Sequence, residues 1–242
     1  MCVATESQHW NDSAQAWLDF VDGSDPNRDC VLDPAMLRLC GDVRGLRVLD
    51  VGCGDGRFCR MLSERGAVTT GIDPTAALLG VARERHPEGD YVEAFAESLP
   101  VAGAGYDLVV SYVTLCDIAD YRQGIAEMAR ALKPGGRLLV ANLNSVASTA
   151  IEGWHMGEDG RQLHMPVDNY TFEWGAIVQW RGIRIVNYHR PMCDYMDAFL
   201  SQGLALTRYE EPLPSPEQIK ERPRLAEYLR VRHFVVMEWR KP

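Results

Sequence analysis

The sequence predicts an α/β fold, a doubly wound and mostly parallel sheet, and three observations support this prediction. Between residues 45 and 143, short apolar runs alternate with helix-like segments, which is the pattern of parallel β-α-β units. The chain has 242 residues, of which 46% are hydrophobic and 24% are charged, so it can bury a core without disulfides or metals. No apolar run approaches the ~20 residues of a membrane helix.

The spacing of apolar residues predicts the individual elements. Residues 9–23 place Trp10 and Trp17 near one face of a helix, and Asp33 before Pro34 marks the start of a second helix over 33–40. The seven strands of the sheet are expected at 47–51, 67–72, 91–94, 106–112, 137–142, 204–209 and 233–239. Helices are expected among them at 58–65, 76–85, 121–132 and 191–202.

Beyond residue 144 the sequence becomes rich in aromatic and turn-forming residues. Residues 172–180 and 183–188 are predicted as two strands joined at Arg181-Gly182, which makes a hairpin. The proline-rich stretch 210–224 is predicted to be a surface loop with a short helix.

Charge and cysteine content narrow the functional classes. The formal net charge of −9 disfavours a nucleic-acid partner, because phosphate contacts dominate that kind of affinity. The seven cysteines are odd in number and form no C-x-x-C pair, which indicates reduced thiols in a cytoplasmic protein. Residues 1–10 have neither the basic nor the apolar region of a signal peptide. No histidine pair has a metal-ligand spacing, so no metal is expected.

A glycine-rich turn gives the strongest functional signal. Residues 48–56 read Val-Leu-Asp-Val-Gly-Cys-Gly-Asp-Gly, at a point where a strand leads into a helix. Gly52 and Gly54 allow a tight turn with no Cβ between the chain and a ligand. Asp50 before them would repel a pyrophosphate and suit a cationic group, whereas Asp73, 23 residues later, suits the two hydroxyls of a ribose. A cofactor with a cationic end, a ribose and no phosphate is S-adenosylmethionine.

On these motifs the chain resembles the class I S-adenosylmethionine-dependent methyltransferases, in the small-molecule branch with the ubiquinone- and menaquinone-type enzymes (methyltransferase type 11-like). The resemblance spans about residues 45 to 143. It rests on five segments in the family's order, at 48–56, 71–75, 96–100, 106–111 and 132–136. The family implies a Rossmann-like sheet of seven strands in which the last is antiparallel, with an inserted aromatic-rich hairpin after the fifth strand.

The resemblance also implies the cofactor contacts. They come from the glycine turn, the end of the second strand, the adenine-side loop and the tip of the fourth strand. These residues are Asp50, Gly52, Cys53, Gly54, Asp73, Pro74, Ala96, Glu97, Ser111 and Tyr112. One position departs from the family, which often has an acid before the alanine of the adenine-side loop, where this chain has Phe95. Glu97, the backbone or stacking are the alternatives for holding adenine.

The sequence therefore predicts four regions within one domain. Residues 1–44 form an N-terminal helical lid and residues 45–143 form the cofactor-binding core. Residues 144–190 form a substrate-side insertion, and residues 191–242 supply a helix and the closing strands of the same domain. The N-terminal helix covers the cofactor in one interpretation and packs on the sheet edge in the other. Arg28 is either a partner for the cofactor's carboxylate or a solvated charge.

The acceptor side is expected in the insertion. His189, in Tyr188-His-Arg-Pro191, is the candidate catalytic base, because similar small-molecule methyltransferases have a like stretch near the substrate mouth. The alternative is a histidine that stabilises a turn. Four further residues are expected to contact a flat apolar substrate, although ordinary core packing explains such aromatics equally well. They are Trp154, His164, Tyr170 and Trp174.

The predicted function is the transfer of a methyl group from S-adenosylmethionine to an O, N or C nucleophile of a small, apolar or aromatic metabolite, by in-line displacement. S-adenosylhomocysteine is the product. The alternatives are a non-catalytic or protein-modifying relative of the same fold, or a nicotinamide-dependent oxidoreductase, which the G-x-G-x-G spacing and Asp50 disfavour. The expected partner is the small-molecule acceptor, without nucleic acid or membrane, and a homodimer remains open.

Overall fold

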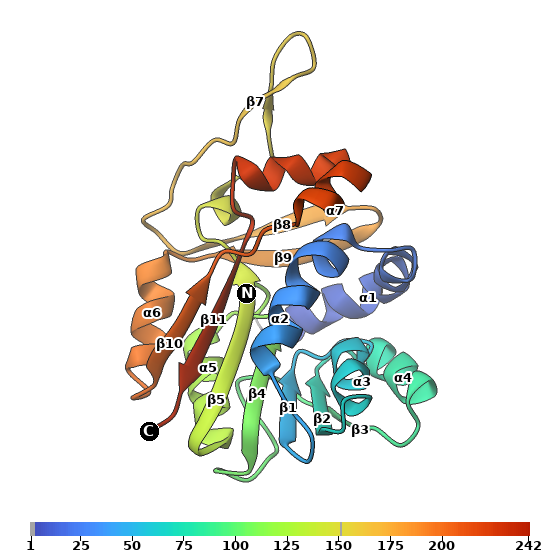
Figure 1. Ribbon diagram of the computed structural model, residues 1–242, viewed down its shortest axis with the longest axis vertical. Helices are drawn as coiled ribbons and strands as arrows, with labels where there is room; N and C mark the ends of the chain where they lie inside the picture. Colours follow the sequence, from blue (N-terminus) through green and yellow to red (C-terminus); the bar gives the residue numbers. More distant parts are fainter. Residues whose placement is uncertain (1–2, 151) are drawn as a thin grey trace.

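A seven-stranded sheet with helices on both faces forms the body of the protein (Figure 1). The computed structural model describes residues 3–150 and 152–242. The strands follow the order β10-β11-β5-β4-β1-β2-β3 across the sheet. Their bounds are β1 Arg47–Val51, β2 Val68–Asp73, β3 Asp90–Glu93, β4 Tyr106–Tyr112, β5 Leu132–Leu143, β10 Ala205–Glu210 and β11 Phe234–Arg240.

The pairing of the strands confirms the predicted topology. β1 pairs in parallel with β2 and β4, β2 with β3, and β4 with β5. β11 pairs antiparallel with both β5 and β10. The order reverses at β1 and β4, because the chain builds outward on one side of β1 before it returns to the other. In open α/β sheets, such a switch point at the carboxyl ends of the strands is where ligands bind.

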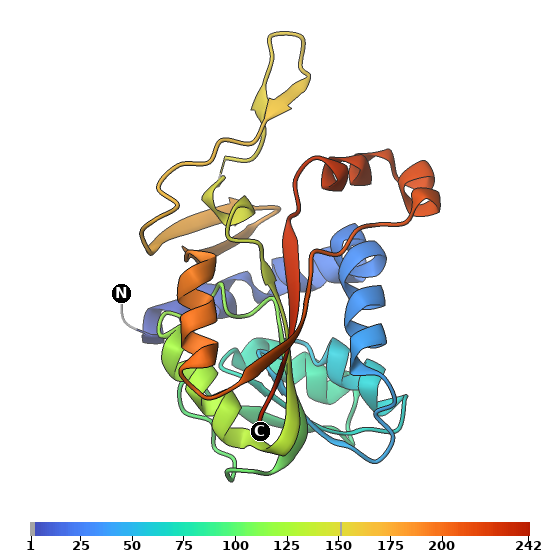
Figure 2. The same ribbon diagram turned by 60° about the vertical axis from the view of Figure 1, so that its left-hand side comes forward.

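Helices cover the two faces of this sheet, as the turned view shows (Figure 2). One hydrophobic cluster packs α5 and α6 against it, and another packs α2 and α3 on the opposite face. The helices are α1 Val3–Asp22, α2 Asp33–Cys40, α3 Arg57–Ser63, α4 Ala76–Arg85, α5 Tyr121–Ala131, α6 Met192–Leu200 and α7 Pro216–Glu221. Short helical turns complete them at Asn27–Leu32, Ala147–Thr149 and Pro223–Leu229.

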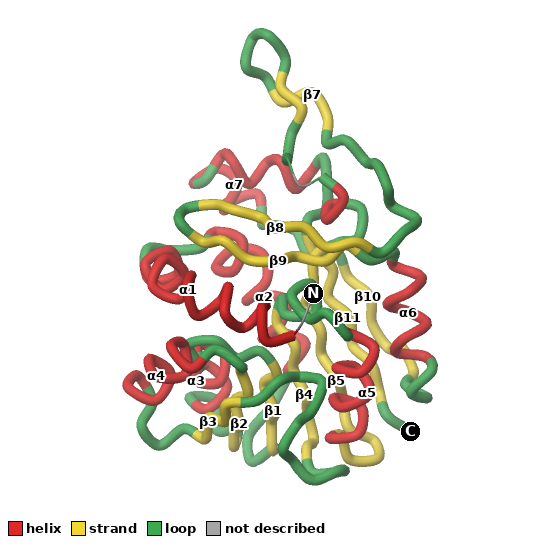
Figure 3. The backbone as a smooth tube through the Cα atoms, turned by 180° about the vertical axis from the view of Figure 1, so that it is seen from behind, coloured by secondary structure: helices red, strands yellow, loops and turns green. Residues whose placement is uncertain are grey.

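Two hairpins occupy the segment between β5 and α6. The strands β8 (Trp174–Trp180) and β9 (Ile183–His189) lie across the carboxyl ends of the sheet strands, next to α1 (Figure 3). Arg181 and Gly182 make their turn with φ of 48° and 85°, which is the backbone that two-residue hairpin loops prefer. The second hairpin, β6 (His155–Met156) and β7 (Gln162–His164), projects away from the body.

The structure extends several elements beyond their predicted ends. The first helix begins at Val3 rather than at residue 9. The fifth strand begins directly after α5 at Leu132 and includes the Pro-Gly-Gly turn. The described cysteines are free thiols. No helix among the described residues has both the length and the apolar character that a membrane crossing requires.

Candidate active site

A cavity of about 330 Å³ opens at the carboxyl ends of β1, β2 and β4. Its floor includes Gly52 after β1, Asp73 at the end of β2 and Tyr112 at the end of β4. Residues of α1 and of the β8–β9 hairpin line it from above. Because parallel strands end at one edge of a sheet, residues far apart in sequence meet here.

The glycine-rich turn is held against β2 by its backbone. The amides of Gly52 and Cys53 both donate to the Ile72 carbonyl, at 2.7 and 3.0 Å. Gly52 has a φ of +79°, and a Cβ on it would lie 2.2 Å from the Thr114 Cγ2 atom. Only glycine therefore fits at the point where β1 turns into the cavity.

Two buried carboxyl groups flank this turn. Asp73 accepts hydrogen bonds from the amides of Gly54 (2.9 Å) and Thr75 (2.8 Å), which fix its orientation. Asp50 is 1% exposed, its Oδ2 accepts a hydrogen bond from the Cys59 thiol, and its Oδ1 has no partner among the described residues. Burial raises the pKa of Asp50 to about 7. A cation bound at the free oxygen would restore the carboxylate.

Two arginines bring positive charge to the opposite wall. Arg57, at the start of α3, makes a two-pronged ion pair with Asp33 at 2.8 Å, and Tyr112 donates to the same carboxylate at 2.6 Å. Arg28 lies over the Trp17 ring, 4.5 Å from its centroid, and approaches Asp25 at only 3.6 Å. Burial and the nearby Arg57 lower the pKa of Arg28. Arg28 thus remains available to an anionic group in the cavity.

Aromatic side chains from separate elements complete the lining. Trp10, Trp17 and Phe20 come from α1, and Trp180 comes from the end of β8. Trp10 and Trp17 pack edge to face with their centroids 5.4 Å apart. The N-terminal helix therefore borders the cavity, and its role as a cover over the cofactor stays a prediction.

The cavity gathers almost all of the residues that the sequence predicted for the cofactor. They are Asp50, Gly52, Cys53, Gly54, Asp73, Pro74, Ala96, Glu97 and Tyr112. Ser111 is different, because its side chain is fully buried in β4 and does not line the cavity. Phe95, at the position of the family's usual acid, also lines the cavity.

The structure places His189 outside this cavity. Its ring is 1% exposed, its Nδ1 lies 2.8 Å from the Ser148 hydroxyl, and its Nε2 donates to the Tyr170 carbonyl at 2.9 Å. A smaller cavity of about 170 Å³ borders His189 and Trp174, whose rings stack 5.2 Å apart. With both ring nitrogens bonded in place, His189 has no contact with the large cavity, and its catalytic role stays a prediction.

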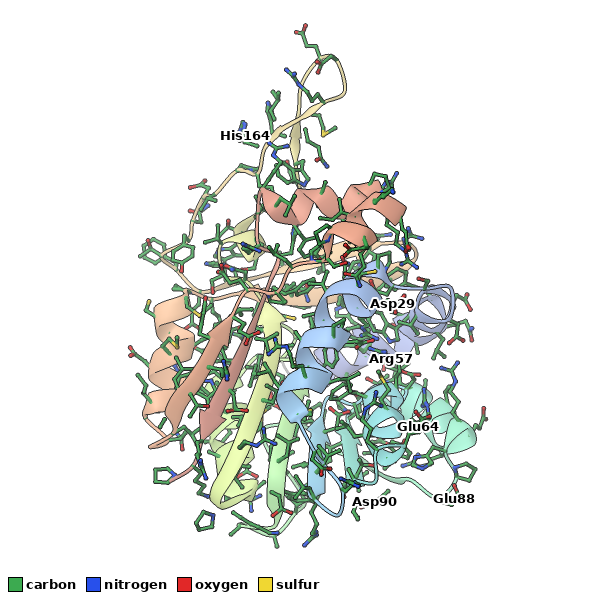
Figure 4. All side chains as sticks on the ribbon, viewed as in Figure 1. Asp29, Arg57, Glu64, Glu88, Asp90 and His164 are labelled. Atoms are coloured by element: carbon green, nitrogen blue, oxygen red, sulfur yellow. The ribbon has the colours of Figure 1, made fainter. Side chains whose placement is uncertain are left out.

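The remaining predicted substrate residues lie farther away. The Tyr170 hydroxyl accepts a hydrogen bond from the Met192 amide, and Trp154 donates to Glu227 at 3.2 Å. His164 lies on the projecting hairpin, far from Arg57 and the cavity, in the side-chain view (Figure 4). The structure does not bring these residues to the large cavity. Tyr170 and Trp154 contact other parts of the protein, and His164 belongs to the β6–β7 hairpin, which the sequence analysis did not predict.

Asp117 is one of the polar groups of the cavity that sequence reasoning missed. It lies in the loop between β4 and α5, beside Cys116, and bonds to Asn187 of β9. The sequence shows an acid, Asp117, just after the fourth strand and an amide, Asn187, near the end of a hairpin strand. Nothing in either segment indicates that they meet, because 70 residues separate them.

Comparisons with known proteins agree with this geometry. The methyltransferase domain family matches residues 49–140. The crystal structure of an S-adenosylmethionine dependent methyltransferase from Mesorhizobium loti is 30% identical, with a TM-score of 0.79 over 86% of this chain and 96% of that one. A ubiquinone biosynthesis O-methyltransferase from Sinorhizobium medicae is 34% identical over 45% of each chain. A demethylmenaquinone methyltransferase from Renibacterium salmoninarum is 34% identical over 43% of this chain and 44% of that one.

The fold and the cavity define a nucleoside-binding α/β protein with a site for a cationic group. The chain belongs to the class I S-adenosylmethionine-dependent methyltransferases, since it covers nearly the whole of a solved member at 30% identity. The cofactor of this family is S-adenosylmethionine, which sets aside the nicotinamide alternative. The chain spans less than half the length of the curated relatives that it matches.

The residues of the cavity fit this cofactor. The unpartnered Oδ1 of Asp50 provides an acceptor for an ammonium group, and the fixed carboxylate of Asp73 keeps lone pairs for hydroxyls. Arg28 lines the same cavity and would offer a counter-ion to a carboxylate. Among the described residues, no three His, Cys, Asp or Glu side chains gather as metal ligands would.

Proposed function

We propose that the chain transfers the methyl group of S-adenosylmethionine to a nucleophilic atom of a small apolar or aromatic metabolite. The observation that carries this proposal is a single cavity with two kinds of lining. Its acidic glycine turn suits a nucleoside with a cationic end, whereas Trp10, Trp17 and Trp180 suit a flat apolar acceptor. The two ligands would therefore meet in one space from which α1 excludes water.

The cofactor-binding residues have separate tasks in this proposal. Asp50 would bind the ammonium group and Arg28 the carboxylate at the amino-acid end. Asp73 would accept the ribose hydroxyls, as its place at the end of β2 suggests. Pro74 and Ala96 would contact adenine by packing, because the usual acid is replaced by Phe95.

When bound, the cofactor supplies an electrophilic methyl carbon on a sulfonium group. The protein must align the acceptor atom with that carbon and keep water out. Such positioning contributes about 7–11 kcal/mol in well-oriented systems. The ion pair between Arg57 and Asp33, with the Tyr112 hydroxyl, makes the wall beside the glycine turn rigid. A base is needed only where the acceptor atom carries a proton.

A cytoplasmic, small-molecule setting is part of the same proposal. The free thiols of the described cysteines fit a reducing compartment. The excess of acidic residues, −9 in formal charge, disfavours nucleic acid as the acceptor. The ubiquinone and menaquinone relatives, named for quinone chemistry, favour a flat ring as the acceptor.

Calorimetry with S-adenosylhomocysteine tests the cofactor half of the proposal. Asp73→Ala removes the carboxylate expected at the ribose and should weaken binding by ~1.5–3 kcal/mol, the scale of hydrogen bonds to charged groups. Glu88→Ala, at an exposed carboxylate distant from the cavity, is the matched control and should leave affinity unchanged (Figure 4). Equal affinity of Asp73→Ala and the wild type would place the ribose elsewhere.

Transfer itself is tested with a methyl-labelled cofactor and a panel of flat aromatic hydroxyl, amine and thiol acceptors. Label should appear in at least one acceptor. Cofactor binding without transfer to any of them would instead favour a non-catalytic or protein-modifying relative.

A further inference from the structure

The large cavity offers few candidates for a proton acceptor. Among the described residues that line it there is no histidine and no lysine. The hydrogen bond with Cys59 and burial raise the pKa of the Cys53 thiol well above its ordinary value. Burial does the same for the pKa of the second thiol in the cavity, Cys116. Asp25 faces Arg28, and Asp55 is paired with Arg60 and Arg85. Asp50, Asp73 and Glu97 belong to the set expected at the cofactor, which leaves one acid on the side of the β8–β9 hairpin.

Asp117 is that acid, and it lies next to the glycine turn. Its amide donates to the Thr114 carbonyl at 2.8 Å, and Thr114 itself contacts Gly52. Both hydrogen bonds that described side chains give to its carboxyl group, from Asn187 and Cys116, end on Oδ1. The Oδ2 atom is therefore left for a ligand in the cavity. The hairpin residues Trp180 and Ile185 also line this space.

A buried arginine holds the loop that carries Asp117. Arg190 is 2% exposed and donates to the carbonyls of Leu115 (2.7 Å), Ile118 and Ala119 (3.0 Å), on both sides of Asp117. Its guanidinium lies over the Tyr121 ring, 4.2 Å from the centroid. The loop is thus fixed from its backbone, and Asn187 fixes the carboxyl group itself. Such rigid support is what a reacting group requires.

Resting on the proposed methyl transfer, we propose that Asp117 is a catalytic residue that accepts the proton of an aromatic hydroxyl acceptor. The O–H bond breaks, and its proton goes to Oδ2 of Asp117. An oxygen lone pair forms the new bond to the methyl carbon, and the electron pair of the broken C–S bond stays on sulfur. The products are a methyl ether, a neutral thioether and the protonated Asp117, which returns its proton to solvent.

The electrostatics of the pocket suit this role. Burial raises the pKa of Asp117 to about 8, while the hydrogen bonds from Cys116 and Asn187 favour the carboxylate. Of the charged groups that face it, Asp73 raises this pKa and Arg190 lowers it. A base with a pKa near the working pH combines a usable fraction of carboxylate with a strong tendency to take a proton.

A pair of probes of the same shape separates proton removal from other roles. The hydroxyl of 2-naphthol keeps its proton at neutral pH, whereas 2-naphthalenethiol ionises more readily and needs less help from a base. Asp117→Asn keeps an oxygen for the Asn187 amide but is a poor proton acceptor. It should lower methyl transfer to 2-naphthol at least 100-fold and change transfer to 2-naphthalenethiol only a few-fold. The wild-type rate with 2-naphthol should rise with pH to about 8, and the variant should lose this rise.

Calorimetry with S-adenosylhomocysteine keeps the two proposals distinguishable. Wild type and Asp117→Asn should bind it equally, and Asp120→Asn, which keeps the helix cap of the same loop, should match the wild type in every assay. Equal losses with both probes, or a wild type that binds S-adenosylhomocysteine but methylates neither probe, would overturn the role of Asp117. Failure of the wild type to bind S-adenosylhomocysteine would overturn the proposed function instead. If Asp117→Asn does not fold, Asp117→Ser is held to the same outcomes.

Discussion

The core at 45–143 and the insertion at 144–190 build opposite walls of one cavity by different means. The core contributes a backbone turn and carboxyl groups fixed by main-chain amides, as at Gly52 and Asp73. The insertion contributes side chains on a two-stranded hairpin, joined to the core through Arg190 and the Asn187–Asp117 hydrogen bond. The family match covers the first wall and not the second. The cofactor wall therefore lies within the matched methyltransferase domain, and the hairpin wall (the proposed acceptor wall) lies outside that match.

Among the substitutions considered, we expect one at Arg190, which joins the two walls, to reduce the stability of the protein most. Arg190→Met leaves the carbonyls of Leu115, Ile118 and Ala119 without their buried donor. We expect the free energy of unfolding in urea to fall by ~3–5 kcal/mol, as when one partner of a buried charged cluster is removed. Arg184→Met, at an exposed position of β9, the strand that ends just before Arg190, is the control and should cost under ~0.5 kcal/mol. Similar values for the two variants would show that the hairpin and the core are not coupled through Arg190.

In the cofactor wall, we expect the buried carboxylate of Asp50 to lower the stability of the ligand-free protein and to strengthen binding of the cofactor. Because its folded pKa is raised from 3.8 to about 7, the folded state binds more protons than the unfolded state between these values. Stability of the ligand-free protein therefore falls as pH rises from about 4 to 7. Asp117, whose pKa is also raised, contributes to the same slope, so Asp50→Asn should make it shallower without removing it, and should weaken S-adenosylhomocysteine binding by ~1.5–3 kcal/mol. Urea unfolding across pH and calorimetry measure the two effects, and a slope equal to that of the wild type in Asp50→Asn would contradict the assignment.

The acceptor wall contains a histidine whose role the structure makes testable. His189→Gln keeps one side-chain donor but not the geometry of both hydrogen bonds, to Ser148 and to the Tyr170 carbonyl. We expect a stability loss of ~1 kcal/mol, with S-adenosylhomocysteine affinity unchanged and methyl transfer within a few-fold of the wild type. A drop in transfer of 100-fold or more at unchanged stability would instead support His189 as the catalytic base.

The sequence predicts the structure of the cofactor wall more completely than that of the acceptor wall. The strands at 47–51 and 106–112 and the helix at 76–85 have the expected bounds, because apolar periodicity and glycine turns are local signals. In β8 the alternation of side chains along a strand puts Trp174 and Trp180 on one face. It does not reveal that Trp180 borders the large cavity and Trp174 the small one. That depends on where the hairpin crosses the sheet.

The same limit explains the rest of the site. Asp117 and Asn187 meet only through tertiary structure, and the loop of Asp117 has no periodic pattern. The sequence places Trp10 and Trp17 on one face of a helix, but no neighbouring residues indicate which surface that face covers. Short-range patterns therefore predicted the cofactor wall, and long-range contacts decided the acceptor wall.

A crystal structure of the chain grown with S-adenosylhomocysteine would examine the central idea most directly. We expect the amino group of the ligand at Oδ1 of Asp50, its ribose hydroxyls at Asp73 and its sulfur facing the Asp117 side of the cavity. Density for the ligand at any other site, or a glycine turn left empty at saturating ligand, would contradict it.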